Sequence, residues 1–442
     1  MAVASALWFL YYPAPMTAEI AVANRIGLAL AADSASTSFS QERVAKIYNS
    51  ADKLFALHER EPIGAMIYGS SSFGGIPWEI LIKLFRSAHP NPCDTINDYG
   101  EAFLDFLRTT PVINDEAVDG SFSLMVRSLL QQVHDAVTTE VAQKAVSLDQ
   151  VAKDFIDKSL QNWSSKAFLG TMDDSTLQQL KARYDAFLEP LAADLLKQYN
   201  LLDPTYRERL KEFILLYAVK DIVQDATGIV IAGFGREQIF PALISYDIES
   251  MIYPRQLRYR EKKREEISLT NVASIVPFAQ EEMVHSFMTG VDPPLRDRVS
   301  QTLGKVMEKL VEELKSKLPN SLSQNEVDSF QLDGLKATSV LLKEFDDTVG
   351  NYSMQRYIKP VLDAVGALPK DQLAVMAETL VALTSFKKKM SMDSETVGGA
   401  IDVAVISKGD GFVWIKRKHY FDLALNPRYT ERIRTFYNQP VP

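Results

Sequence analysis

Two pairs of short apolar runs follow one another between residues 17 and 70. The first pair, at 18–23 and 28–32, flanks the sequence "NRIG". Asn and Gly tolerate the left-handed backbone of a tight turn, so this segment predicts a β-hairpin. The second pair, "KLFAL" and "IGAMIYG", predicts another hairpin around the polar loop "HEREP". A helix is predicted over 76–88, because Pro77 lies near its start and apolar residues recur at helical spacing.

Two long stretches with a helical repeat interrupt the strand-like runs, at 92–222 and at about 277–390. Their predicted apolar faces consist of Leu177, Leu180, Tyr184, Phe187, Leu191 and Leu195 in the first stretch, and of Leu303, Val306, Leu310, Leu314 and Leu318 in the second. Strands return at 228–235, 240–248 and 251–258, and a hairpin around Lys408–Gly411 ends the pattern. The charged run at 260–266 is expected in a solvated loop or at a strand end.

The order of these segments predicts one α+β core with two helical insertions, because the strands on either side of each helical stretch need each other to form sheets. The expected core comprises residues 17–91, 223–290 and 366–442. The expected insertions are 92–222 and 291–365.

Composition narrows the function classes. The 442 residues carry a net charge of −9, which argues against a nucleic-acid or anionic-membrane partner. No run approaches the roughly 20 apolar residues of a membrane span. The single cysteine, Cys93, cannot form an internal disulfide, and no histidines pair at metal-ligand spacing. These features predict a cytoplasmic protein without a metal or other cofactor.

The two N-terminal hairpins place their polar residues at their open ends, where these residues could meet at one edge of a sheet. If the first hairpin turns between Arg25 and Ile26, Thr17 lies beside Asp33. If the second closes around residues 59–61, Lys53 lies opposite Ile67, at the same end as Gly69. Each of these residues is also common at strand ends and turns, so the spacing alone favours a site only modestly.

These four residue types together suit nucleophilic catalysis by a threonine. A threonine hydroxyl needs a base, and an N-terminal threonine has its own α-amine, with an unperturbed pKa of about 7.7–8.0. A lysine cation favours the neutral amine and the developing alkoxide, and an aspartate orients that lysine. A glycine N–H stabilises the oxyanion. On this hypothesis Thr17, Asp33, Lys53 and Gly69 are catalytic.

The pattern resembles the proteasome β-subunit family of N-terminal-nucleophile (Ntn) hydrolases, including bacterial proteasome-type peptidases. The likeness begins at "TAEIAVANRIGLALAADSAST", where Thr17 and Asp33 have the spacing of the family's catalytic Thr and Asp. "ADKLFAL" matches the segment of the catalytic lysine at Lys53. "MIYGSSSFGG" matches the strand that ends in the oxyanion glycine at Gly69.

The C-terminal match is the tightest. "MDSETVGGAIDVAVISKGDGF" resembles the family's Asp-Ser-x-Ser/Thr-Gly-Gly segment, which implies catalytic roles for Asp393 and Thr396. Thr37 matches a position whose backbone pairs with bound peptide, and Ile67 matches a wall of the specificity pocket. The family's Gly-Ser-Gly turn before its third helix has no match in "ASIVPFAQEEM".

The resemblance covers about half the chain and implies a four-layer αββα sandwich. It also implies a threonine-type peptidase or amidase that works through an acyl-enzyme on a peptide or unfolded protein substrate. Assembly into a homo-oligomeric ring or filament and an ATPase partner are further expectations. A different class of function remains open: the chain could be a catalytically silent proteasome-like scaffold that binds a partner through its helical insertions.

The segment before Thr17 bears on activity, because the α-amine of Thr17 can act as a base only when it is free. Residues 1–16 are expected to be a start-site artefact or a pro-segment. Translation from Met16 is favoured, since methionine aminopeptidase removes Met before a small residue such as Thr17. The apolar stretch "ALWFLYY" lacks the positively charged segment and cleavage site of a signal peptide.

Overall fold

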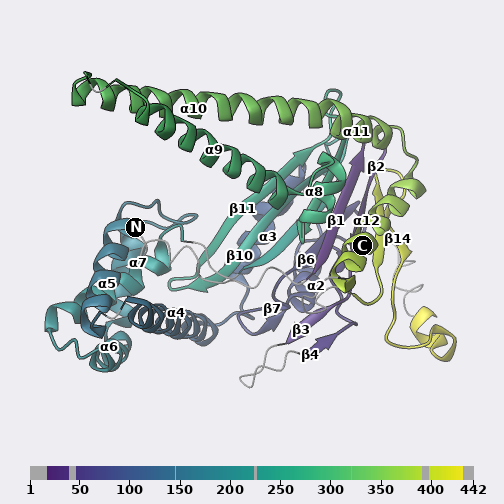
Figure 1. Ribbon diagram of the computed structural model, residues 1–442. Helices are drawn as coiled ribbons and strands as arrows, with labels where there is room; N and C mark the ends of the chain where they lie inside the picture. The colour runs from purple at the N-terminus through teal and green to yellow at the C-terminus, as the bar shows by residue number, and fades with distance from the viewer. Residues whose placement is uncertain are drawn as a thin grey trace.

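The computed structural model describes residues 17–38, 46–144, 146–222, 226–319, 321–390 and 398–431. Figure 1 shows two β-sheets with helices around them, and both large sheets are antiparallel throughout. The predicted α+β class is therefore confirmed. Within the described residues, no helix is long and apolar enough to cross a membrane.

The first sheet contains the predicted N-terminal and C-terminal hairpins in the strand order β12–β1–β2–β13–β14. Its strands are β1 (Ala18–Asn24), β2 (Gly27–Ala32), β12 (Ala273–Ala279), β13 (Asp402–Ser407) and β14 (Gly411–Lys416). Asn24 lies opposite Gly27, so the chain turns at Arg25 and Ile26 as predicted. The C-terminal hairpin pairs Ser407 with Gly411, also as predicted.

The second sheet has the strand order β11–β10–β9–β6–β5. Its strands are β5 (Leu54–Ala56), β6 (Ile63–Tyr68), β9 (Thr227–Gly233), β10 (Ala242–Ile252) and β11 (Gln256–Glu266). Leu54 pairs with Met66, and the N–H of Ile67 donates to the carbonyl oxygen of Lys53, which confirms the predicted register of the second hairpin. Two small two-stranded sheets accompany the large ones: β3 (Ser36–Ser38) with β4 (Lys46–Tyr48), and β7 (Ser72–Phe73) with β8 (Ile76–Pro77).

The two large sheets face each other across a shared apolar core. Alternate residues of a strand point to opposite faces. In β1, Ala21 and Ala23 therefore point toward the second sheet, where Met66 and Val230 belong to the same buried cluster. Ile20 points the other way, toward helices.

Helices cover the outer face of each sheet. On the first sheet they are α8 (Glu282–Thr289), α11 (Lys359–Gly366) and α12 (Lys370–Met390), and α12 packs its Leu373, Ala377 and Val381 against β1 and β2. On the second sheet they are α2 (Trp78–Ala88) and α3 (Ile96–Thr109). A capping box, in which the side chains of Thr95 and Asp98 bond each other's backbone N–H groups, starts α3.

The remaining helices form two groups outside this core. A bundle with its own apolar cluster contains α4 (Asp115–Lys144), α5 (Leu148–Ser164), α6 (Asp174–Gln198) and α7 (Pro204–Val219). A long hairpin of α9 (Pro293–Ser316) and α10 (Gln324–Ser353) extends away from the sheets along the top of Figure 1. A π-helical turn (η1, Met354–Ile358) joins α10 to α11, and a 3-10 turn (η2, Leu423–Leu425) follows the C-terminal strand.

A buried charge pair connects the α4–α7 bundle to the second sheet. Arg258 on β11 is fully buried, and its Nε donates to Glu249 Oε2 on β10 over 2.9 Å. The same guanidinium donates to the carbonyl oxygens of Ala218 and Ile222 at the end of α7. The last turn of the bundle is thereby fixed against the sheet.

The structure refines several of the predicted elements. The charged run 260–266 forms the partly exposed C-terminal end of the long strand β11, which agrees with the strand-end alternative and not with a loop. Helix α6 continues through Pro190, although a proline inside a helix removes one backbone hydrogen bond. Helix α3 falls inside the predicted insertion 92–222 but packs on the second sheet beside α2, so the separate bundle begins with α4.

Candidate active site

The first candidate residue lies just before β1, on the face that points toward the second sheet. Thr17 and Glu19 are two positions apart, and residues so spaced in an extended chain share a face. Only 5% of Thr17 and 2% of Glu19 is exposed. The hydroxyl Oγ1 of Thr17 donates a hydrogen bond to Glu19 Oε2 over 2.9 Å.

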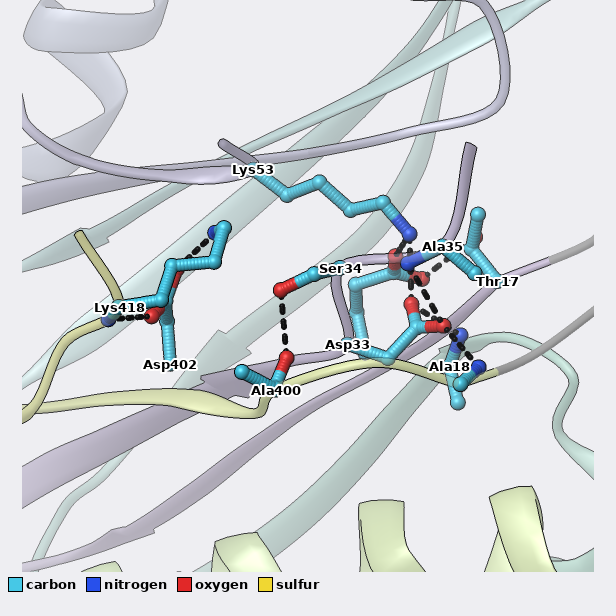
Figure 2. Close-up of polar contacts among 11 residues, drawn as sticks. Thr17, Ala18, Asp33, Ser34, Ala35, Lys53, Ala400, Asp402 and Lys418 are labelled. Carbon is cyan, nitrogen blue, oxygen red and sulfur yellow. Dashed lines mark hydrogen bonds and ion pairs between the residues drawn. The ribbon is translucent and has the colours of Figure 1, made fainter. Parts of the chain in front are cut away.

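Asp33 follows β2 and lies beside Thr17, as the predicted register requires. Its Oδ1 accepts a hydrogen bond from the N–H of Ala18 at 3.2 Å. Its Oδ2 accepts from the N–H of Gly398 at 3.0 Å and from that of Ala35 at 3.4 Å. Three backbone donors thus hold one buried carboxylate, which joins three chain segments (Figure 2).

Lys53 enters the same site from the second sheet. Its Nζ lies 2.5 Å from Asp33 Oδ1 and 3.3 Å from Glu19 Oε1. The lysine side chain is 6% exposed, so the ion pairs are shielded from water. In Figure 2 the Lys53 side chain extends over Asp33 toward Thr17. The structure therefore brings together three of the predicted residues, Thr17, Asp33 and Lys53.

The site holds two buried carboxylates and one lysine. The pKa of Glu19 is raised from 4.5 to about 8: burial and the nearby Asp33 raise it, while Lys53 and the hydroxyl of Thr17 act in the opposite direction. A carboxyl group with this pKa changes its protonation state near neutral pH. Such groups are suited to general acid–base chemistry.

Gly69 directly follows β6, near the strand end where Ile67 bonds to Lys53. Its φ of +87° is a conformation that side chains rarely adopt, and a Cβ there would lie 2.7 Å from the carbonyl oxygen of Ala226. The backbone geometry alone therefore requires glycine. Ile67 is buried in the cluster between the second sheet and its helices, together with Phe73 and Trp78.

The other predicted positions are described only in part. Asp393 and Thr396 lie outside the described residues. The segment that follows them reaches the site, because Gly398 donates to Asp33 and accepts a hydrogen bond from the N–H of Ser34 at 3.2 Å. For Thr37 only the backbone is described, and it pairs with Ile47 of β4.

A second group of charges lies beside the site and was not predicted from the sequence. Lys418 bonds to Asp402 at the start of β13 through both its backbone N–H, at 2.7 Å, and its amine. The same amine lies 3.0 Å from Asp52, the neighbour of Lys53. Figure 2 shows Lys418 and Asp402 together, apart from the Thr17 group. These contacts connect the end of the C-terminal hairpin to the segment that carries Lys53.

Glu19 is the site residue that sequence reasoning missed. Its signal was present in "TAEIAVAN", where 17, 19, 21 and 23 share one face of a strand. In that series Glu19 is the one charged residue, two positions from the candidate nucleophile. An acidic residue on the buried face of a strand needs a partner, and the structure provides Lys53.

Comparison with models of protein families gives no match for this chain, and comparison with curated proteins gives no significant match either. Within the described ranges, no group of three or more His, Cys, Asp or Glu residues could hold a metal ion. The positive charge between the two carboxylates is the chain's own Lys53.

Proposed function

We propose that this chain is a threonine-type peptidase or amidase in which Thr17 is the nucleophile. The observation that carries the proposal is the buried hydrogen-bonded group in which the Thr17 hydroxyl meets a carboxylate, next to the Lys53–Asp33 ion pair. A hydroxyl becomes a nucleophile when an adjacent base can take its proton and when that base is itself oriented. The site contains candidate groups both for the base and for holding that base in position.

In the proposed reaction, Thr17 Oγ1 attacks the carbonyl carbon of a peptide or unfolded protein substrate. The backbone N–H of Gly69 donates to the oxygen that becomes negative, an interaction worth roughly 2.7–4 kcal/mol in comparable sites. The amine leaves, and water then hydrolyses the ester on Thr17. Lys53 stabilises the developing negative charge, and Asp33 holds Lys53 in place.

The fold gives independent support. Two facing antiparallel sheets with helices on both outer faces are consistent with the αββα sandwich of Ntn hydrolases. The candidate nucleophile precedes the first strand of one sheet, and the lysine comes from the other. The hydrogen bond from Gly398 to Asp33 brings a glycine of the C-terminal match to the family to the same site.

The test uses the full chain and a peptide boronate or epoxyketone with a fluorescent label. Labelling should depend on Thr17: Thr17→Ala should abolish it, and Thr17→Ser should retain part of it. Ser70→Ala is the matched control, because Ser70 is an exposed hydroxyl next to Gly69. Intact mass would show whether the labelled chain begins at Thr17. Equal labelling of the wild type and Thr17→Ala would contradict the proposal.

The second candidate function, a silent scaffold, is favoured by one observation. The α9–α10 hairpin exposes many large apolar side chains, among them Val306, Leu310, Leu332 and Val340. Apolar surface of this extent is typical of a partner-binding face. On this alternative, Thr17→Ala would leave partner binding unchanged and no probe would label Thr17.

A further inference from the structure

The hydroxyl of Thr17 donates to a carboxylate that the resemblance does not assign to the reaction. We propose that Glu19 is the general base that takes the proton from Thr17 Oγ1 during acylation. The inference rests on the proposed role of Thr17 as nucleophile and adds a residue to it. Ntn-type chemistry, as implied by the resemblance, gives this proton to the α-amine of Thr17 instead.

The geometry places the carboxylate within reach of the proton. Glu19 Oε2 lies 2.9 Å from Thr17 Oγ1, inside the range of about 2.6–3.2 Å expected for a base and its nucleophile. Glu19 is held on both sides by strand pairing, opposite Ala32 on β2 and Phe278 on β12. Because the base is on a central strand, its position depends little on loop movement.

The charges around Glu19 suit a group that gains and loses a proton. Lys53 and Asp33 interact with the carboxyl group, the lysine favouring its ionised form and the aspartate its neutral form. Burial raises the pKa of Tyr68 on β6, Glu19 adds to that rise, and the Tyr68 hydroxyl donates to Asp247 at 3.1 Å. Burial, Asp33, Lys53 and the hydrogen bond from Thr17 together bring the pKa of Glu19 to about 8, near working pH.

The proton balance of the step is complete. As the Oγ1–carbon bond forms, the hydroxyl proton moves to Glu19 Oε2, and the carbonyl π electrons move to the oxygen. When the intermediate collapses, the carbon–nitrogen bond breaks and Glu19 gives the proton to the leaving amine. In deacylation, Glu19 takes a proton from water as it attacks the ester, and returns it to Thr17 Oγ1 when the acid leaves.

The test measures the rate at which the full chain is acylated by a small β-lactone between pH 6 and 9. Mass spectrometry of the Thr17 peptide identifies the adduct. For the wild type, the rate should rise with pH as Glu19 ionises and level off above about pH 8. Glu19→Gln keeps a hydrogen-bond acceptor beside the hydroxyl but cannot take its proton. It should slow acylation about 100-fold or more and remove the rise.

The outcomes separate this inference from the proposed function. A Thr17 adduct that forms in Glu19→Gln at the wild-type rate, with the wild-type pH profile, would overturn Glu19 as the base and leave Thr17 as the nucleophile. Absence of any Thr17 adduct in the wild type would overturn both. Loss of the pH-dependent rise in Glu19→Gln would support both.

Two further variants exclude a merely structural effect. Glu19→Gln should fold, because Lys53 and Asp33 then form a charge-balanced pair; its melting temperature is compared with that of the wild type. Glu19→Asp keeps the charge but shortens the side chain by one methylene, so it should give an intermediate rate with a pH-dependent rise. Glu378→Gln on α12, which removes a surface carboxylate paired with Lys416, is the control and should match the wild type.

Discussion

At the scale of single residues, the candidate site is defined by three charges in a space that admits little water. Asp33 and Lys53 would form a balanced pair by themselves. Glu19 adds a second carboxylate, and the result is a site with one more negative charge than positive when all three groups are ionised. A buried unbalanced charge is expensive, so the structure favours the protonated form of Glu19.

This preference has a consequence for stability that can be measured. The folded state keeps the Glu19 proton up to about pH 8, whereas the unfolded chain releases it near pH 4.5. Between these values the folded state binds more protons, so the free energy of unfolding should fall as pH rises and then level off above pH 8. Glu19→Gln should lack this contribution.

The measurement is urea unfolding of the wild type and Glu19→Gln at several pH values from 4.5 to 9. The difference between the two proteins isolates Glu19, since their other titrating groups are shared. We expect the difference to change by something on the order of a few kcal/mol across the window. Parallel pH curves for the two proteins would show that Glu19 is ionised throughout.

At the scale of elements, the end of β6 is shaped by crowding against the neighbouring strand. Gly69 has a left-handed backbone and lies against the carbonyl oxygen of Ala226, just before β9. Gly75 has a similar φ of +78°, but no atom lies within 4 Å of its missing Cβ. The two positions therefore share the backbone requirement and differ in crowding.

Gly69→Ala and Gly75→Ala should separate these two effects. Each should lose about 1–2 kcal/mol of stability from the left-handed conformation. Gly69→Ala should lose more, because Ala226 must also move, and the shift would displace the N–H proposed for the oxyanion. Chemical denaturation gives both values. Equal losses for the two variants would mean that the strand end adjusts without strain.

The same apolar repeat is buried in one helix and exposed to solvent in another. In α6, the predicted face packs into the bundle, with Leu180, Tyr184 and Leu195 buried. In α9, the predicted stripe is largely exposed, with Val306 56% and Leu310 50% accessible. Helix α9 meets α10 through another face, where Val311 lies against Gly334. The apolar repeat predicts the helix in both cases, but it does not predict what covers it.

At the scale of the whole molecule, the described parts differ in how well their apolar side chains are covered: the stacked sheets and their helices enclose buried clusters, whereas the α9–α10 hairpin exposes many apolar side chains. Leu373 on α12 is fully buried against the first sheet. Leu310 on α9 lies on the hairpin that extends away from the core in Figure 1. The same substitution at these two positions compares a core helix with the extended hairpin.

Leu373→Ala should destabilise the protein by about 2–5 kcal/mol, because it leaves a cavity beneath the sheet. Leu310→Ala should change stability by less than about 0.5 kcal/mol. Denaturation at two protein concentrations provides the check. A large, concentration-dependent loss for Leu310→Ala would show that a second copy of the chain covers the hairpin, as ring or filament assembly would require.

The sequence by itself determined the local part of this structure. Turn residues and two-residue alternation are short-range properties, so both N-terminal hairpins and their registers could be predicted. Those registers brought Thr17 beside Asp33 and Lys53 opposite Ile67. The α+β class followed from the same periodicities, and the end of the second predicted hairpin also indicated the glycine at 69.

Only the tertiary structure decided which surfaces meet. The contact between Glu19 and Lys53 joins two sheets, and no spacing along one chain segment specifies how two sheets face each other. The packing of α3 on the core and the exposure of the α9 stripe depend in the same way on distant partners. The pKa of Glu19 is the clearest case, because it arises from burial and from charges on two other segments, at Asp33 and Lys53.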